Sequence, residues 1–192
     1  MFKITFKQEN YDEEYWKTRS VLEQKHNILA SQFCKIANLQ QDDLVLDYGC
    51  GTGQYIHSLR ELNIDAVGYE PSKVAVSNAY GLAKDRIDNK INPKEYRPFK
   101  PITCLDVMEH LSKPEIDYTI GLIHTLLETN GYAIFCICFD GDPNFDLDPT
   151  HITCRPQWWW EDLMVMKGFE LVDVPKDLIY GHQFIICKKV IQ

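Results

Sequence analysis

Stretches with the apolar period of a helix alternate with short continuous apolar runs along most of this chain. Between Val21 and Ile36, apolar residues recur at helical spacing, which predicts a helix over residues 17–38. The same period predicts further helices over residues 54–62, 74–83, 116–127 and 156–168. The apolar runs predict strands over residues 44–47, 65–70, 101–106, 132–139, 169–174 and 183–189.

Local residue types set the expected ends of these elements. Pro71 stops the second strand, and Ser72 is a suitable N-cap for the helix that follows it. Thr129-Asn130-Gly131 is a stop signal between a helix and the next strand. Residues 84–100 are polar and contain two prolines, so no element is predicted there.

Strands that alternate with helices favour a parallel sheet covered by helices on both faces. The last two strands are joined by a short connection that can form a hairpin, so one antiparallel strand is expected at the end of the series. The length of 192 residues fits one domain over residues 1–192, which begins with a helical segment over about residues 1–40.

Composition removes several classes of function. The net charge of −8 disfavours a nucleic-acid partner, because proteins that neutralise phosphates usually carry a basic face. No apolar run approaches the ~20 residues that a membrane span requires, so no membrane association is expected. Residues 1–10 lack the apolar centre of a secretory signal, and we expect a cytoplasmic protein.

The seven cysteines form no CxxC pair, and no Cys/His spacing resembles a zinc site. Most of them lie in apolar stretches, where cysteine behaves as a small hydrophobe. We therefore expect reduced cysteines and no metal site.

The strongest chemical signal is a glycine-rich turn between the first strand and the helix after it. Gly49, Gly51 and Gly53 follow Asp47, and glycines there let a ligand lie against the main chain. Glu70 ends the next strand, 21 residues after Gly49. Because the ligand crevice of an open α/β sheet lies beyond the carboxyl ends of the strands, this carboxylate can accept hydrogen bonds from both hydroxyls of a ribose.

A dinucleotide site has a similar arrangement. The GxGxxG fingerprint counted from Gly49 requires glycine or alanine at position 54, where this chain has Gln54. The alternative ligand is S-adenosylmethionine, which carries no phosphate. Asp47 can hold its ammonium group directly or through water.

Four segments of the chain resemble, in the same order, the motifs of class I S-adenosylmethionine-dependent methyltransferases. They are Leu46-Asp47-Tyr48-Gly49-Cys50-Gly51-Thr52-Gly53, Tyr69-Glu70-Pro71-Ser72, Asp106-Val107-Met108-Glu109-His110-Leu111 and Asn130-Gly131-Tyr132-Ala133-Ile134. Together they cover about residues 45–140. Residues 11–16 also resemble the N-terminal segment that folds over the cofactor in many relatives, although an amphipathic helix start gives the same pattern.

The resemblance implies a Rossmann-like, doubly wound α/β fold with a seven-stranded sheet whose last strand is antiparallel. It implies S-adenosylmethionine as the cofactor and S-adenosylhomocysteine as the product. The cofactor contacts that it implies are Asp47, Tyr48, Gly49, Gly51, Gly53, Glu70, Pro71, Leu105, Asp106 and Tyr15. An acid near the adenine is not assigned, because Asp85 and Asp88 are both candidates and either can be a solvated surface residue.

The acceptor side is predicted after the fifth strand, where Asp148-Pro149-Thr150-His151 resembles a segment of small-molecule methyltransferases of the ubiquinone-biosynthesis type. A neutral imidazole can remove a proton near pH 7, so His151 is the candidate general base. It can instead tie its loop to the sheet, and His110 can compete for the role. Arg155 can bind an acidic group of the acceptor or lie on the surface.

The sequence therefore predicts methyl transfer to a small-molecule acceptor, with a sugar or ring hydroxyl as the expected acceptor group. Two alternatives stay open. One is methylation of a protein or peptide side chain, and the other is a cofactor-binding regulatory protein without catalysis. Turnover to S-adenosylhomocysteine separates an enzyme from a pure binding protein.

Overall fold

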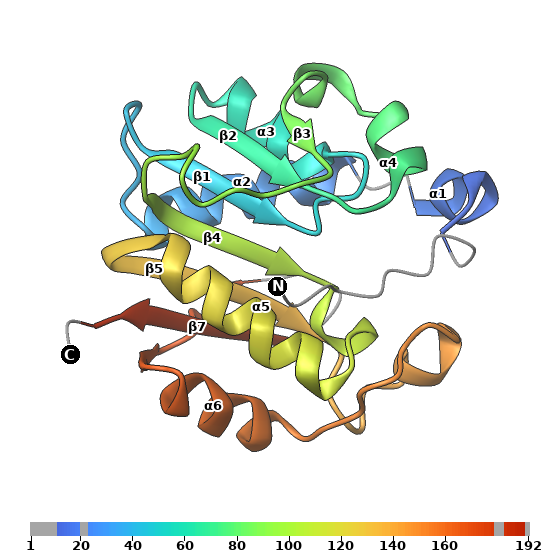
Figure 1. Ribbon diagram of the computed structural model, residues 1–192, viewed down its shortest axis with the longest axis vertical. Helices are drawn as coiled ribbons and strands as arrows, with labels where there is room; N and C mark the ends of the chain where they lie inside the picture. The colour runs from blue at the N-terminus through green and yellow to red at the C-terminus, as the bar shows by residue number, and fades with distance from the viewer. Residues whose placement is uncertain (1–10, 20–22, 179–182, 191–192) are drawn as a thin grey trace.

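A seven-stranded sheet with the order β3-β2-β1-β4-β5-β7-β6 runs through the middle of the computed structural model (Figure 1). The structure describes residues 11–19, 23–178 and 183–190. The strands are β1 (Leu44–Tyr48), β2 (Asp65–Tyr69), β3 (Ile87–Asp88), β4 (Phe99–Leu105), β5 (Leu127–Ile137), β6 (Phe169–Val172) and β7 (Gln183–Lys189). β7 is antiparallel to both β5 and β6, whereas the pairs from β3 to β5 are parallel. The predicted doubly wound fold with an antiparallel last strand is confirmed.

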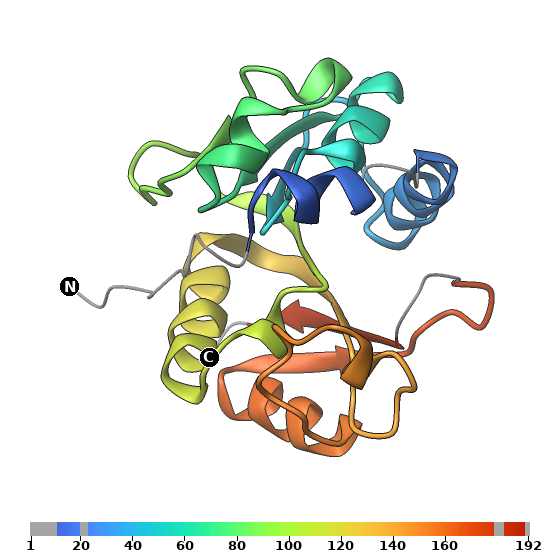
Figure 2. The same cartoon turned by 90° about the vertical axis from the view of Figure 1, so that its right-hand side faces the viewer.

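Helices cover both faces of this sheet. They are α1 (Glu13–Arg19), α2 (Glu23–Ile36), α3 (Gln54–Glu61), α4 (Lys73–Ser77), α5 (Lys113–Leu126) and α6 (Gln157–Met166), with short 3₁₀ helices η2 (Gly81–Ala83), η3 (Met108–His110) and η4 (Phe145–Leu147). Figure 2 shows α5, in yellow, and α2, in blue, on opposite sides of the sheet. The carboxyl ends of β1, β2 and β4 point toward α1 and the segment 140–156 (Figure 1).

Successive side chains of a strand point to opposite faces, so the sheet separates two cores. Leu46 of β1 packs with α5 and α6, and its neighbour Val45 packs with α2 and α3. Trp160 of α6 is fully buried in the first core, and Phe33 of α2 is fully buried in the second. These cores hold the carboxyl edge of the sheet in place. Among the described residues, no helix is long and apolar enough to cross a membrane.

The region of the first predicted helix contains two helices, α1 and α2. The first begins at Glu13, before the predicted start at residue 17, because the Asp12 carboxylate accepts a hydrogen bond from the Tyr15 backbone N–H at 3.0 Å and caps it. Residues 1–10 and 20–22 lie outside the described residues, and so does the segment used to argue against a secretory signal.

The predicted helix over residues 74–83 is too long. Ser72 caps its start as expected, since the hydroxyl accepts from the Ala75 N–H at 3.2 Å. The helix ends at Ser77, where the side chains of Ser77 and Asn78 both donate to the Val74 carbonyl. A separate 3₁₀ turn, η2, follows it.

The polar segment 84–100, where no element was predicted, contains β3. This strand has only Ile87 and Asp88, which pair with Gly68 and Tyr69 of β2. Two residues are too few for any periodicity to appear in the sequence.

The predicted stop at Thr129-Asn130-Gly131 lies inside β5, which starts directly after α5. The register with β4 moves from the pair Phe99 and Leu127 to the pair Pro101 and Tyr132. The turn residues therefore form a bulge, in which Asn130 adopts a φ of 64°. The residue types were interpreted correctly as irregular backbone, but the strand continues on both sides of it.

Gly68 of β2 and Gly121 of α5 form a matched pair for testing the packing. A Cβ at Gly68 would lie 2.5 Å from Ile56 Cδ1 and against Cys50 Sγ, whereas a Cβ at Gly121 meets nothing within 4 Å. We expect Gly68→Ala to destabilise the fold by about 1–3 kcal/mol through overpacking. Gly121→Ala should stabilise it by roughly 0.5–1 kcal/mol through helix propensity. Thermal unfolding followed by circular dichroism measures both, and equal melting temperatures would contradict the described packing.

Candidate active site

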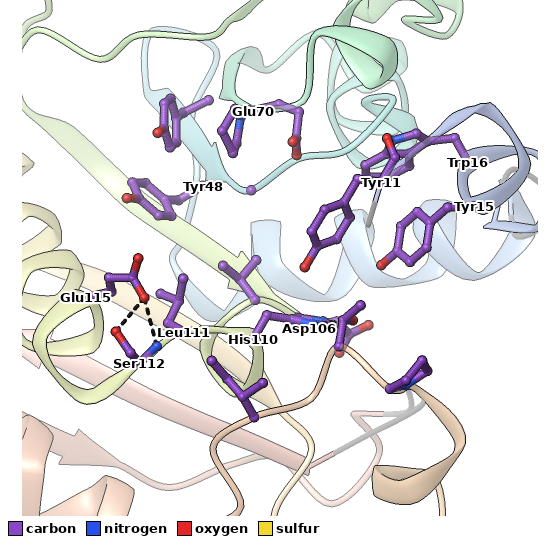
Figure 3. Close-up of a pocket in the computed structure, with 17 residues that line it drawn as sticks. Tyr11, Tyr15, Trp16, Tyr48, Glu70, Asp106, His110, Leu111, Ser112 and Glu115 are labelled. Carbon is purple, nitrogen blue, oxygen red and sulfur yellow. Dashed lines mark hydrogen bonds between the residues drawn. The ribbon is translucent and has the colours of Figure 1, made fainter. Parts of the chain in front are cut away.

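A cavity of about 490 Å³ opens at the carboxyl edge of the sheet, between α1 and the segment that follows β5. Its walls come from five parts of the chain that are far apart in sequence (Figure 3). The glycine loop after β1 and the end of β2 form one side. The turn after β4, together with Pro149, Thr150 and Ile152, forms the other. α1 and Tyr11, two residues before its start, complete the lining.

Several residues predicted to contact a cofactor line this cavity. They are Tyr15, Tyr48, Gly49, Glu70, Pro71 and Asp106. The remaining predicted contacts, Asp47, Gly51, Gly53 and Leu105, are not part of the lining. His151 lies behind it, and His110 lines it.

Three of the predicted contacts outside the lining are held in place by other parts of the protein. Asp47 is only 4% exposed, and its carboxylate accepts a hydrogen bond from the Thr103 hydroxyl at 2.8 Å. Gly51 is covered by an aromatic ring, because a Cβ there would lie 2.8 Å from the Trp16 ring. Leu105 packs into the core beside α2 and α3.

Glu70 holds two backbone segments together from inside the protein. Its side chain is 4% exposed. One carboxylate oxygen accepts the backbone N–H of Ser72 at 2.7 Å, and the other accepts that of Gly51 at 2.9 Å. The glycine loop and the start of α4 are therefore fixed by one charged group.

Two carboxyl groups at this edge have raised pKa values. Burial raises the pKa of Asp47 to about 7, against the lowering effect of the Thr103 hydrogen bond, and the charge of Glu70 adds to the rise. Burial also raises the pKa of Glu70 to about 7, although its two backbone hydrogen bonds lower it. The charged form of each carboxyl group is stabilised by nearby hydrogen-bond donors or positive charge.

An aromatic wall closes the cavity on the side of α1. The rings of Tyr11 and Tyr15 meet edge to face with centroids 4.9 Å apart, and both project into the cavity in Figure 3. The Trp16 indole N–H donates to the Ser72 hydroxyl and to the Tyr11 carbonyl, each at 3.2 Å. The sequence analysis assigned Tyr15 but missed Tyr11 and Trp16, whose only signal was their place in the N-terminal segment.

The turn after β4 carries the opposite wall. Asp106 adopts a φ of 55°, and η3 follows at once. Glu109 within η3 is fully buried, and its carboxylate accepts the Cys138 backbone N–H at 3.0 Å. Its backbone carbonyl accepts the N–H groups of Ile152 and Thr153, at 2.9 and 3.0 Å. Glu109 therefore attaches the acceptor-side segment to the end of the sheet.

This attachment brings two histidines together. The rings of His110 and His151 lie 4.7 Å apart between centroids. His151 Nδ1 hydrogen-bonds the Phe145 carbonyl at 2.9 Å, and His110 Nδ1 hydrogen-bonds the Thr150 hydroxyl at 2.8 Å. The hydrogen bond of His151 stays within its own loop, and both roles of this residue remain predictions.

A cluster of possible metal ligands also forms here, where the sequence analysis predicted none. Donor atoms of Glu109, His110 and His151 all lie within 4.8 Å of one another. Burial raises the pKa of Glu109, and the negative charge of Asp106 raises it further. No ligand spacing reveals this set in the sequence, because His151 comes from a different element than its two partners.

A second pocket of about 480 Å³ adjoins the first and shares Ser112 and Ile152 with it. Trp159 forms its aromatic face, with Arg155 at 5.6 Å and Lys113 Nζ at 5.8 Å from the ring centroid. The three consecutive tryptophans lie in different surroundings, because consecutive side chains of a helix point in different directions. Trp160 is buried in the core, Trp159 faces this pocket and Trp158 is 61% exposed.

Comparison with known protein families identifies one family for this chain. The family described as "Methyltransferase domain" matches residues 18–172. An uncharacterized methyltransferase of Anoxybacillus flavithermus is 30% identical over 133 residues, which are 65% of this chain and 57% of that protein. The chain thus aligns with little more than half the length of this curated relative.

Solved structures support the same fold. An S-adenosylmethionine-dependent methyltransferase from Archaeoglobus fulgidus aligns with a TM-score of 0.64 at 16% identity, over 85% of this chain and 94% of that chain. The magnesium protoporphyrin IX methyltransferase from Synechocystis PCC 6803, with bound S-adenosylhomocysteine, aligns with a TM-score of 0.65 at 16% identity, over 86% and 84%. At these identities the likeness concerns the fold.

The raised pKa values predict how stability depends on pH. A carboxyl group whose pKa is about 7 when folded and 4.5 or below when unfolded binds protons more tightly in the folded state. Stability should therefore fall as pH rises from about 4.5 to about 7, by an amount on the order of a few kcal/mol. Melting temperatures of the free protein across this range measure the fall.

Glu70→Gln removes one of these titrating groups, so its melting temperature should fall less over the same pH range. Glu170→Gln, on an exposed position of β6, is the matched control and should retain the wild-type slope. A Glu70→Gln variant with the full wild-type slope would show that the buried carboxyl does not titrate in this window.

Proposed function

The chain belongs to the methyltransferase domain family, and on this premise we propose that it transfers the methyl group of S-adenosylmethionine to a hydroxyl of a small-molecule acceptor. The observation that carries the proposal is the cavity at the carboxyl edge, with a buried carboxylate at the end of β2 and an aromatic wall from α1. Its volume of about 490 Å³ lies within the range of ~300–1,000 Å³ typical of small-molecule sites.

The cofactor's ribose is proposed to lie against Glu70. Each carboxylate oxygen accepts one backbone N–H, and a carboxylate oxygen has two lone-pair positions. Each oxygen can therefore accept one ribose hydroxyl as well. The sulfonium end then extends along Gly49 toward Asp106 and His110, and the rings of Tyr11 and Tyr15 cover the ligand.

The proposed reaction is an in-line displacement. An acceptor oxygen forms a bond to the methyl carbon, the carbon–sulfur bond breaks, and its electron pair stays on sulfur as S-adenosylhomocysteine forms. The hydroxyl proton leaves the acceptor in the same process. Because the methyl group is already activated, the main contribution of the protein is to position acceptor and donor.

The acceptor is proposed to be a ring compound that carries an acidic group. The support is the second pocket, where a flat aromatic face, Trp159, lies beneath the cations of Arg155 and Lys113. Guanidinium groups bind carboxylates and phosphates through paired hydrogen bonds. The pocket shares residues with the cofactor cavity, so a bound ring can direct a hydroxyl toward the methyl group. Such an acceptor fits the ubiquinone-biosynthesis-like branch.

His151 is proposed to act on the acceptor hydroxyl. Its Nδ1 faces the Phe145 carbonyl and therefore carries the proton in the neutral ring, which leaves the lone pair on Nε2. This nitrogen can take the hydroxyl proton, or it can hold a cation that polarises the hydroxyl.

Calorimetric titration tests the cofactor assignment. S-adenosylmethionine and S-adenosylhomocysteine should bind, and NAD should bind much more weakly. Glu70→Gln should weaken cofactor binding by about tenfold or more, because hydrogen bonds to a charged group contribute roughly 1.5–3 kcal/mol each. Glu170→Gln should leave the affinity unchanged. Tight NAD binding without a response to either sulfur compound would refute the methyltransferase assignment.

A second experiment tests His151, with release of S-adenosylhomocysteine from a pool of phenolic and sugar acceptors as the measurement. His151→Ala should lower turnover by ~10²–10⁴-fold, while cofactor affinity changes little. His124→Ala, on α5, is the matched histidine control. A lower melting temperature, together with an equal loss of turnover for every acceptor, would instead show that His151 only holds the loop. Normal turnover and normal melting would refute both roles.

A further inference from the structure

Glu109, His110 and His151 converge although they lie in two elements. η3 supplies the first two residues, and the segment after η4 supplies the third. Their donor atoms lie within 4.8 Å of one another. Ligands around a first-row divalent cation stand at about 2.0–2.2 Å from the ion, so they are roughly 3–4 Å apart. The observed limit of 4.8 Å is wider than this, so the three side chains would move closer together when an ion binds.

The carboxylate of the cluster is the first sign of a missing positive partner. Glu109 is 0% exposed, and one oxygen accepts the Cys138 N–H. The other oxygen, Oε2, is buried and has no hydrogen-bond partner among the described residues. A buried charged group normally has its hydrogen-bonding positions filled by protein, water or metal.

The imidazoles are the second sign, because their outer nitrogens are already fixed. His151 Nδ1 donates to the Phe145 carbonyl. The Thr150 hydroxyl donates to Asp148 Oδ1, so its oxygen accepts the proton of His110 Nδ1. Both neutral rings therefore carry their lone pair on Nε2. Metal-binding histidines almost always donate the other ring N–H to a carbonyl, carboxylate or water in this way.

We propose that Glu109, His110 and His151 bind one divalent transition-metal ion. Two histidines and one carboxylate on one side of an ion leave further coordination positions on the other side. His110 also lines the cavity, so these positions face the place of methyl transfer. The chemical class of the cofactor is a first-row dication such as Mn²⁺, Fe²⁺, Co²⁺ or Zn²⁺.

The proposed role of the ion rests on the methyltransferase function argued above. An acceptor hydroxyl that coordinates the ion loses its proton to water more readily, because the cation stabilises the oxyanion. The oxyanion then attacks the methyl carbon, and the electron pair of the broken bond stays on sulfur. His151 is a ligand in this scheme, so the general-base role is replaced by the ion.

Binding of Mn²⁺ tests the site without any acceptor. Protein stripped with EDTA is titrated with Mn²⁺, and the electron paramagnetic resonance signal of the free ion is measured. We expect one saturable site per chain, and Zn²⁺ should displace the Mn²⁺ because it binds nitrogen ligands more tightly. His110→Ala and His151→Ala should each weaken binding by about tenfold or more. Glu109→Gln should do the same without changing the side-chain volume.

His124→Ala, which removes a histidine from α5, should retain the wild-type affinity. Melting temperatures identify any variant that fails to fold. Thr150→Val then serves as the milder probe, because it removes the hydroxyl that hydrogen-bonds His110 and Asp148 and leaves all three proposed ligands in place. Absence of a saturable Mn²⁺ site, or equal affinity in the folded cluster variants and the control, would overturn the proposal.

The same protein separates this proposal from the proposed function. S-adenosylmethionine is titrated into the EDTA-treated protein, where binding is expected because the proposed ribose contact, Glu70, is not one of the three ligands. A failure of that titration refutes the methyltransferase function and leaves the Mn²⁺ result to stand by itself. With both bound, Mn²⁺ should broaden proton resonances of S-adenosylhomocysteine more at its amino-acid end than at adenine. Equal broadening at both ends would overturn the catalytic role of the ion.

Discussion

The carboxyl edge of this sheet depends on one buried charge, the carboxylate of Glu70. It accepts backbone N–H groups from the glycine loop and from the start of α4, so two connections that leave the sheet separately are held at a fixed distance. Ser72, at that helix start, accepts the indole N–H of Trp16, whose ring lies over Gly51. One carboxylate thus orders the loop, the helix start and the aromatic wall. The same group is then in place to bind a ribose.

A second buried carboxylate organises the acceptor side in a similar way. Glu109 binds the end of β5 through its side chain and the segment 152–153 through its backbone carbonyl. Burying either charge costs stability, as the raised pKa values of both groups indicate. The two cores on either side of the sheet provide the packing that offsets this cost. The fold therefore tolerates strain at its edge, including the positive φ of Asp106.

Much of this architecture was predictable from the sequence because local signals and tertiary structure agree. The glycine turn, the cap at Ser72 and the alternation of helices with strands all have causes within a few residues of one another. The two-residue strand β3 was not predictable, since its pairing with β2 and not its own pattern creates it. The bulge at residues 129–131 was interpreted as a stop for a related reason, because turn residues within a strand look the same as turn residues between elements.

The site was less predictable than the fold, because its contacts join distant segments. Trp16 contacts Gly51 because α1 lies over the glycine loop, and His151 contacts His110 in a segment whose residues 152–153 are bound by Glu109. These contacts depend on where loops return to the sheet, which no spacing in the sequence specifies.

The pair of histidines also distinguishes between the two chemistries considered for the acceptor side. A general base needs only one imidazole with an available lone pair, so the second imidazole has no role in that chemistry. Here both rings carry the proton on Nδ1, fixed by a carbonyl for His151 and by a hydroxyl for His110. Both lone pairs are therefore on Nε2, and the two histidines form a cluster with Glu109, one oxygen of which is buried without a hydrogen bond among the described residues. Donor atoms of two imidazoles and one carboxyl group that lie within 4.8 Å of one another can all bind a single cation, whereas a proton can satisfy only one or two of them.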